Sequence, residues 1–296
     1  MESLFNNVFD CALVFEGGGY RGAYTAGIAN VLLEHDIWFD YVCGVSAGAS
    51  HTIDYVSRDQ YRVKEAFMAR NGTEPIGGLG TFLRGKGYFN ADYLYEGCIA
   101  DGSGPFSWEP FVANPARIRI QAFDRDTGAS VTFTKDDMPN VWEAIKRVRA
   151  SSTIPIAMPP EPVDGRVLYD GGLGEGAGIP IPMAEADGFE RFVFVGTRVA
   201  GYRKQAPSPA LLTIMKRLFR RYPHVYEAFR TRHVRYNEAL DHVAELEREG
   251  RALVIRPDVM PIKNGTLNSA ELEHAYDLGH AQGERELSRI KEFVGL

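Results

Sequence analysis

The chain has little cysteine for its length. Only Cys11, Cys43 and Cys98 occur among 296 residues. An odd and sparse set of this kind excludes the disulfide framework on which many small secreted domains depend. Cys11 and Cys43 fall in apolar runs, where a free thiol behaves as a small hydrophobic side chain. The cysteine content therefore predicts a reducing compartment, and we expect the cytoplasm.

Long apolar runs are also missing. The first such run, Cys11–Phe15, already ends at Glu16, whereas a membrane-spanning helix needs roughly 18 or more apolar residues. The acidic residues near the start do not fit the positively charged beginning of a signal peptide. We expect neither a span nor a signal peptide, and peripheral contact with the inner membrane face stays open.

An excess of positive charge is absent as well. The chain has 33 Lys and Arg against 39 Asp and Glu, for a net charge of −6. That balance argues against nucleic-acid binding as the main task. One local exception is the stretch Lys216–Arg235, where basic side chains alternate with apolar ones. Such a stretch can lie on anionic lipid, but we favour a solvated helix face with its apolar side in the core.

Glycine-rich turns separate an alternation of strands and helices near the start. The apolar runs Cys11–Phe15 and Phe39–Cys43 predict buried strands, followed by helices over Ala23–Glu34 and Ala47–Val56. This order implies a parallel sheet with right-handed crossovers. We therefore predict a three-layer α/β/α fold with a mostly parallel central sheet and a helix-rich C-terminal part.

The rest of the chain continues the alternation less regularly. Residues 71–110 are crowded with glycine, and we interpret them as a lid or cap with a short helix near Ala91–Ala100, or as a surface excursion without a role. Later predicted strands are Arg117–Phe123, Ala129–Thr134, Val167–Tyr169, Arg191–Thr197 and Ala252–Ile255, and later helices are Val141–Ala150, Leu211–Arg221, His224–Glu249 and Ser269–Phe293. A boundary near residue 200 predicts a main domain over residues 8–200 and a helix-rich extension over residues 201–296 packed on it.

A Gly-x-Ser-x-Gly pattern stands between the second strand and the second helix. Its flanking glycines, Gly44 and Gly48, lack the side chains that would collide on a sharp turn, which is the arrangement of a nucleophile elbow. Ser46 would then stand at a helix N-terminus, where the helix dipole favours developing negative charge. A plain helix cap is the alternative role. We interpret Ser46 as a candidate nucleophile.

A second glycine-rich turn follows the first strand. Gly17, Gly18 and Gly19 can present backbone N–H groups without side-chain obstruction, as acyl transfer requires for its oxyanion. Gly22 lets the following helix start close to the sheet. We expect Arg21 to hold this loop in place by an ion pair or hydrogen bonds, with Glu16 as its partner. The turn therefore predicts an oxyanion cradle.

The same glycines also spell a dinucleotide-binding fingerprint. Gly17, Gly19 and Gly22 match Gly-x-Gly-x-x-Gly, which likewise needs a strand before it and a helix after it. That fold requires an acidic residue at the end of the second strand. Here Asp40 lies before that strand, at the wrong end. We keep nucleotide binding as a less favoured alternative.

A serine nucleophile needs a proton acceptor, and the histidines do not offer one. None of the seven has the strand-end or turn setting of a catalytic base, and His51 lies five residues beyond Ser46 on the same predicted helix. Asp170 does have the setting, since it follows a short strand and precedes Gly171 and Gly172. An ordinary Asp-Gly turn is the alternative. Partial burial would raise the pKa of this carboxyl and improve it as a base.

The three motifs, in this order, resemble those of the patatin-like phospholipase family over roughly residues 11–200. Matching positions are Gly17, Gly18, Gly19, Arg21 and Gly22 in the oxyanion loop, Gly44, Ser46 and Gly48 in the elbow, and Asp170, Gly171 and Gly172 in the third turn. The segment before the catalytic aspartate of that family also looks like Ala150-Ser151-Ser152 with Pro155 and Pro159. The tail after residue 200 is similar to the helical extension of some bacterial members.

The resemblance implies a Ser–Asp dyad without histidine and lipid acyl esters as substrates. Ser46 would attack the ester carbonyl, Asp170 would take its proton, and no metal or cofactor would be needed. A non-catalytic acyl-lipid- or nucleotide-binding protein that uses the glycine loop as an anion cradle is the alternative. Chain length, head group, positional preference and oligomeric state do not follow from the sequence.

Overall fold

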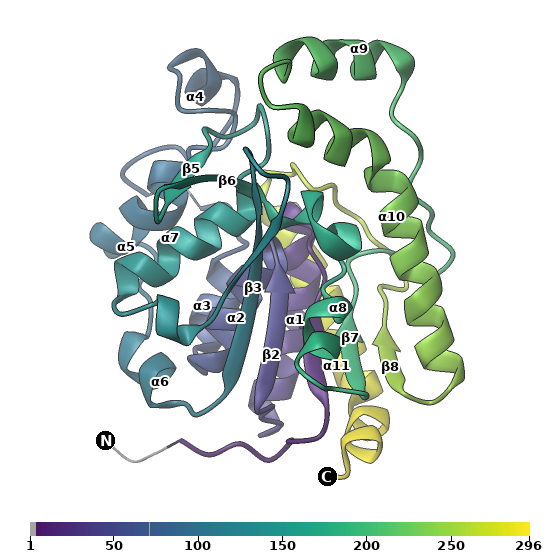
Figure 1. Cartoon of the computed structure of the whole chain (residues 1–296). Coiled ribbons are helices and arrows are strands. Elements are labelled where there is room, and N and C mark those ends of the chain that lie inside the picture. The colour runs from purple at the N-terminus through teal and green to yellow at the C-terminus, as the bar shows by residue number, and fades with distance from the viewer. Residues whose placement is uncertain (1–3, 71) are drawn as a thin grey trace.

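A computed structural model describes residues 4–70 and 72–296 of the chain, and one sheet forms its centre (Figure 1). The sheet of the described residues contains eight strands in the order β5-β6-β3-β2-β1-β7-β8, with β4 paired to β3. Their bounds are β1 Ala12–Phe15, β2 Tyr41–Val45, β3 Arg117–Asp124, β4 Ser130–Phe133, β5 Glu161–Val163, β6 Arg166–Asp170, β7 Phe192–Val195 and β8 Ala252–Ile255. The predicted α/β fold with a mostly parallel sheet is confirmed.

Parallel pairing dominates the middle of the sheet. β3, β2, β1, β7 and β8 run parallel to their neighbours, whereas β4 and β6 pair with β3, and β5 with β6, in antiparallel fashion. Leu13 of β1 is in register with Val42 of β2 and Val193 of β7. The carboxyl ends of these parallel strands therefore share one edge of the sheet, where α/β proteins commonly place their sites.

Helices cover both faces of this sheet. Their bounds are α1 Gly22–Glu34, α2 Ala47–Val56, α3 Gln60–Glu65, α4 Leu79–Leu83, α5 Cys98–Ala100, α6 Trp108–Ala113, α7 Val141–Ser152, α8 Ile181–Ala186, α9 Pro209–Leu218, α10 Pro223–Arg248 and α11 Ser269–Val294. Among the described residues no helix combines the length and the apolar character that crossing a bilayer requires.

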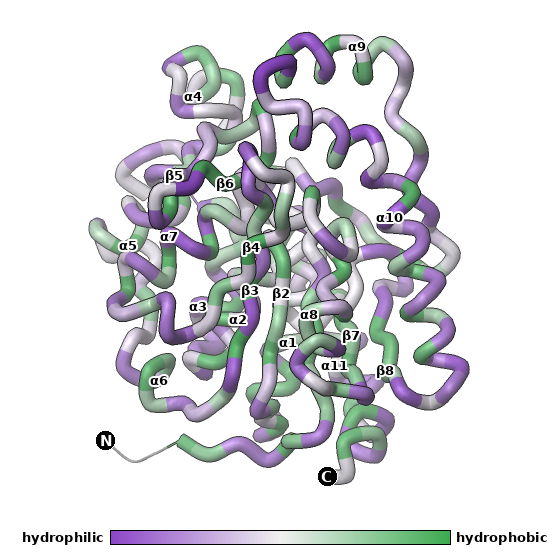
Figure 2. The backbone as a smooth tube through the Cα atoms, viewed as in Figure 1, coloured by the Kyte–Doolittle hydropathy of each residue, from purple (hydrophilic) through white to green (hydrophobic). Residues whose placement is uncertain are grey.

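The core is divided between the two faces of the sheet. Leu13 and Phe15 of β1 pack with residues of α1 and α2 in the larger hydrophobic cluster. The alternate residues Ala12 and Val14 pack with residues of α8 and α10 in a second cluster. This alternation follows from the two-residue period of a strand, and Figure 2 shows the apolar strands between helices of mixed hydropathy. The arrangement has three layers.

The C-terminal part joins this architecture through three elements. β8 pairs with β7, α11 packs along α1, and α10 packs on the second face of the sheet. A side chain on Gly279 would begin 1.9 Å from the carbonyl oxygen of Tyr24, and one on Gly27 would begin 2.3 Å from the amide of His280. Glycine is thus required at both positions for the two helix backbones to approach. The division near residue 200 stays a prediction, and the sheet itself contains residues from both sides of it.

Several predicted bounds differ from the structure. β2 begins at Tyr41 rather than Phe39, because Phe39 forms an isolated bridge with Val8 instead. α7 continues through Ser152, two residues beyond its predicted end. The short elements α3, β5 and α8 were absent from the sequence prediction. The irregular segment was expected to begin at residue 71, which lies outside the described residues. From residue 72 its helices are short, and they include Asp92–Gly97 and Cys98–Ala100.

Candidate active site

The sharp turn between β2 and α2 places Ser46 in a conformation that side chains rarely adopt. Its φ is 58° and its ψ is −121°, outside the main allowed regions for an L-residue. A side chain on Gly44 would begin 2.0 Å from the carbonyl oxygen of Gly48, and one on Gly48 would begin 2.2 Å from that of Phe15. The two flanking glycines are therefore needed sterically, as the sequence predicted. The Ser46 amide donates to Ser151 Oγ at 2.9 Å.

Asp170 ends β6, beside the neighbouring strand β3. Its amide donates to the carbonyl of Thr153 at 2.8 Å, and its Oδ1 accepts from the Gly172 amide at 2.7 Å. The sheet register brings the two turns together, because Val45, beside Ser46, pairs with Gln121 of β3 and Asp170 pairs with the next residue, Ala122. Burial raises the pKa of Asp170 above its ordinary value, while the positive charge of Arg232, the nearby Ser46 hydroxyl and the Gly172 amide oppose that rise. Two predicted turns that lie far apart in sequence thus meet here.

The glycine loop after β1 lies against the elbow. A side chain on Gly17 would begin 3.3 Å from Ser46 Cβ, but the Gly17 amide donates to the carbonyl of Gly178 at 2.9 Å. Gly17 therefore has no free N–H, which corrects the expectation of three donors. Within the described ranges, the amides of Gly18 and Gly19 donate to no protein acceptor, so these two remain as candidate donors.

Close contacts fix the conformation of the same loop. Gly18 faces the side chain of Thr197, which would stand 2.7 Å from an added Cβ. Gly19 has a φ of 56° and would meet the carbonyl oxygen of Asn264 at 2.6 Å. A side chain on Gly22 would begin 2.2 Å from the ring of Phe67. These glycines are needed for backbone geometry and close approach.

Arg21 is buried directly behind the glycine loop, but it does not pair with Glu16 as expected. Glu16 accepts from the Thr197 amide at 2.5 Å and from the Tyr236 hydroxyl, and no carboxylate of the described residues lies within ion-pair distance of Arg21. Burial, followed by the charge of Arg198, lowers the pKa of Arg21 to about 10, against which the charge of Glu16 raises it. Arg21 therefore contributes a positive charge beside the glycine loop that no carboxylate of the described residues pairs with.

Two further cations come from the C-terminal part, and no neighbouring motif in the sequence indicated their position. Nη2 of Arg232 lies 2.5 Å from where a side chain on Gly172 would begin, and Asp170 Oδ1 lies 2.8 Å from the same point. Lys204 is half-buried, and burial together with the charges of Arg232 and Arg198 lowers its pKa to about 7. The charges of Arg232 and Lys204 both lower the pKa of Asp170. The site is electropositive in an acidic protein.

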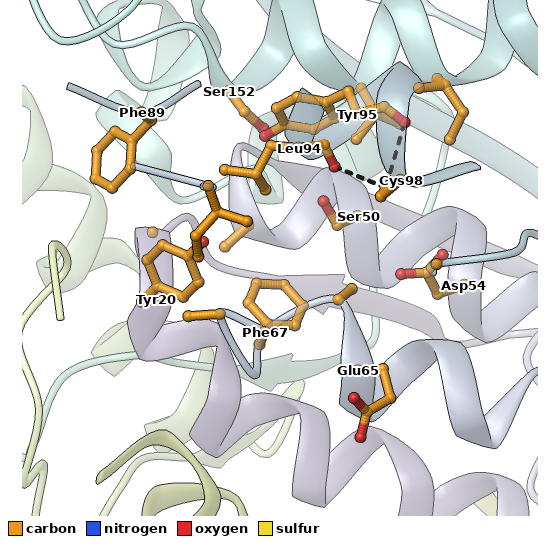
Figure 3. Close-up of a pocket in the computed structure, with 18 of the residues that line it drawn as sticks. Tyr20, Ser50, Asp54, Glu65, Phe67, Phe89, Leu94, Tyr95, Cys98 and Ser152 are labelled. Atoms are coloured by element: carbon orange, nitrogen blue, oxygen red, sulfur yellow. Dashed lines mark hydrogen bonds between the residues drawn. The ribbon is translucent and has the colours of Figure 1, made fainter. Parts of the chain in front are cut away.

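Ser46 lines a mostly apolar pocket, part of whose wall is drawn in Figure 3. It follows one face of α2, through Ala47, Ser50, Ile53 and Asp54. Asp54 lies eight positions after Ser46, which corresponds to about 12 Å along a helix. Rings and aliphatic side chains from other segments complete the wall, among them Tyr20, Phe67, Phe89, Tyr93, Leu94, Ile145, Val148 and Met158. Most of this wall is apolar.

The far end of the pocket is more polar. Asp54 is 1% exposed, and its Oδ1 lies 3.5 Å from Nε of Arg62. Burial raises the pKa of Asp54 to about 7, although the charge of Arg62 opposes the rise. Sequence reasoning missed this pair, because an acidic residue inside an amphipathic helix gives no signal of burial.

The histidines have other roles than general base. His51 is fully buried, with Nε2 2.8 Å from the hydroxyl of Thr25, and burial lowers its pKa to about 3. His280 pairs with Glu34 at 2.8 Å on the surface between α11 and α1. Glu284 lies close enough for these three side chains to share a metal ion, whereas the sequence had predicted no metal site. The three are distant from the Ser46 pocket in the fold, and we assign them no role there.

Comparison with known proteins decides the family. The profile described as patatin-like phospholipase matches residues 13–184, more than half of the chain and all three motifs. This chain belongs to the patatin-like phospholipase family. A second profile, described as a domain of unknown function (DUF6363), matches residues 222–295. The patatin match covers Ser46 and Asp170, whereas Arg232 lies in the second matched range and Lys204 in neither.

Individual relatives of this patatin-like chain are distant. The uncharacterized protein YjjU of Escherichia coli (strain K12) is 27% identical over 201 residues, which are 63% of this chain and 51% of YjjU. The chain thus aligns with about half the length of that curated relative. The crystal structure of VipD from Legionella pneumophila superposes with a TM-score of 0.45 at 12% identity, covering 93% of this chain and 67% of VipD.

Proposed function

We propose that this protein is a serine acyl hydrolase that cleaves carboxylic esters of lipids, with Ser46 as nucleophile and Asp170 as base. The observation that carries the proposal is the convergence of two distant turns: the sheet register places Ser46 and the buried Asp170 on either side of β3, and Ser46 lines a mostly apolar pocket. The strained elbow of Ser46 adds support, because such backbone conformations cluster at functional sites. Phospholipase A, lysophospholipase and esterase activities all fit this chemistry.

The proposed reaction has two halves. Ser46 Oγ attacks the ester carbonyl carbon while Asp170 takes its proton, and the amides of Gly18 and Gly19 stabilise the tetrahedral oxyanion. The protonated Asp170 then gives that proton to the departing alkoxide as the C–O bond breaks. In the second half Asp170 deprotonates a water that attacks the acyl-enzyme, and the proton finally returns to Ser46 Oγ as the free acid leaves.

The surroundings of the dyad suit this chemistry. Burial raises the pKa of Asp170, which makes its carboxylate a better proton acceptor near neutral pH. Arg21, Lys204 and Arg232 add positive charge where an oxyanion or a lipid phosphate would stand. The reaction needs neither metal nor cofactor. We place it in the cytoplasm, because Cys11, Cys43 and Cys98 are free thiols.

The experiment that tests the proposal combines activity with active-site labelling. Hydrolysis of a short-chain aryl ester and labelling by a fluorophosphonate probe should both be lost in Ser46→Ala, and hydrolysis should be lost in Asp170→Asn. Ser57→Ala is the matched control, since Ser57 caps the other end of α2 and bonds only to the Asp54 carbonyl. Labelling that persists in Ser46→Ala would refute Ser46 as nucleophile, and a wild-type protein that never reacts would favour a binding protein.

A further inference from the structure

Helix α9 exposes an apolar stripe instead of burying it. Leu211, Ile214 and Leu218 are 40%, 54% and 56% exposed, and their spacing of three and four residues puts them on one face of the helix. Leu212 is half-buried, while Met215 and the residue after the helix, Phe219, are buried in a small cluster with residues of α10. In Figure 1, α9 lies at the upper end of the molecule, above the first turns of α10.

Positive charge is concentrated at the end of the same helix and in the turn after it. Lys216 and Arg217 lie in the last turn of α9, Arg220 and Arg221 follow it, and the stretch from Ser208 to Tyr222 contains no acidic residue. In the part of the chain that the structure describes, none of these four side chains has an ion-pair partner, although most other arginines do. A cationic helix on a protein of net charge −6 indicates an anionic partner.

A second exposed apolar group lies at the same end of the molecule. Leu79, Phe82 and Leu83 of α4 are 69%, 47% and 76% exposed, and Figure 1 shows α4 at the same upper end as α9. The residues that flank α4, Ile76 and Phe89, line the Ser46 pocket. The segment that exposes these apolar side chains is therefore continuous with the wall of the proposed active site.

We propose that α9 and α4 form a docking surface for an anionic phospholipid membrane. Amphipathic helices of this composition lie in the interface, with aliphatic side chains in the acyl boundary and Lys or Arg among the head groups. The exposed side chains of α4 would enter the same layer. The purpose of docking rests on the proposed function, because the surface would bring lipid esters to the Ser46 pocket.

Two other partners fit the surface less well. In a two-fold contact with a second copy of this chain, the cationic patch of Lys216, Arg217, Arg220 and Arg221 would face the same cationic patch of the other copy. A nucleic acid would neutralise the charge but leave Leu211, Ile214 and Leu218 exposed. An anionic lipid surface satisfies both features of α9. This helix also lies between the two ranges matched by the family profiles, 13–184 and 222–295, so neither match describes it.

Vesicle sedimentation with the full chain tests the proposal. Wild type should sediment with vesicles that contain phosphatidylglycerol and remain in solution with pure phosphatidylcholine vesicles. Arg220→Gln with Arg221→Gln should lower binding to the anionic vesicles roughly 30-fold, from about fivefold for each cation. Ile214→Asp with Leu218→Asp should abolish it. Val112→Asp is the matched control, because Val112 of α6 is 56% exposed, as Leu218 is, and α6 lies at the other end of the view in Figure 1.

Hydrolysis of a soluble aryl ester separates this proposal from the proposed function. All the surface variants should keep the wild-type rate, which also shows that they fold. Wild type that binds both kinds of vesicle equally or neither, or binding that survives both double variants, would overturn the docking surface even if the enzyme is active. A wild-type dimer in sedimentation velocity that the Ile214→Asp and Leu218→Asp pair dissociates would assign the surface to a second copy instead.

Discussion

The backbone at Ser46 allows strain to be measured apart from chemistry. Ser46→Ala and Ser46→Gly both remove the hydroxyl and every interaction it makes, so their difference reports the Cβ alone. Alanine keeps a Cβ at a φ of 58° and a ψ of −121°, whereas glycine adopts positive φ freely. We therefore expect Ser46→Gly to be the more stable of the two inactive variants.

The magnitude follows from two opposing effects. A non-glycine residue in a sparsely populated backbone region costs about 1–3 kcal/mol. Glycine relieves that strain but loses about 0.5–1 kcal/mol to the greater freedom of its unfolded chain. The middle values of these two ranges leave Ser46→Gly more stable than Ser46→Ala by about 1 kcal/mol. At about 2–4 °C per kcal/mol for a chain of this size class, Tm should rise by roughly 2–4 °C.

Urea unfolding at equilibrium and thermal unfolding are the assays. The midpoint should change without a change in the slope m, which would show that both variants unfold to the same ensemble. Ser50→Ala and Ser50→Gly provide the control pair, since Ser50 lies in the interior of α2, where glycine is less favourable than alanine by about 1 kcal/mol. The two pairs should thus differ in opposite directions. Equal stabilities of the Ser46 variants, or a less stable glycine variant, would refute backbone strain at the elbow.

Two further predictions concern the site. Burial raises the pKa of Asp170 above 3.8, and a base acts in its deprotonated form. We therefore expect kcat/KM to fall as the pH is lowered through a value above 3.8. A profile that stays flat down to pH 4, with the protein still folded, would exclude this carboxyl as the base. Gly18→Ala should displace the loop, since its Cβ would stand 2.7 Å from Thr197, and should lower kcat by about 10²–10³ as for a lost oxyanion donor. Gly265→Ala, where the space is open, serves as its control, and a Gly18→Ala enzyme with unchanged kcat would argue against the Gly18 amide.

Much of the fold could be predicted because its signals are local. The first strand and the first two helices were placed within a residue or two, since strict apolar runs stand directly beside glycine turns. β8, Ala252–Ile255, was predicted with its observed bounds. β5, Glu161–Val163, was missed. Its three residues are too few for a periodic pattern, and it becomes a strand only by pairing with β6.

The site was predictable only where a turn defines it. Ser46 and Asp170 each stand at a strand end beside glycines, and this local geometry is encoded in neighbouring residues. Arg232 approaches the same carboxyl through the packing of α10 on the sheet, and Lys204 through a loop whose backbone is hydrogen-bonded to Asn237 of α10. Nothing beside either residue in sequence marks that role. The hydrogen bond that occupies the Gly17 amide depends likewise on Gly178, 161 positions later.

The late position of β8 has a consequence for synthesis on the ribosome. β7 gains its outer neighbour only when residue 255 has emerged, and α1 gains its cover only when α11 follows. Until then a nascent chain that already contains Ser46 and Asp170 would expose the edge of β7, with its unpaired main-chain groups, and the apolar surface of α1 that α11 later covers. Such surfaces invite association between partly made copies. Chains interrupted between the two family matches should therefore be prone to aggregation and dependent on chaperones.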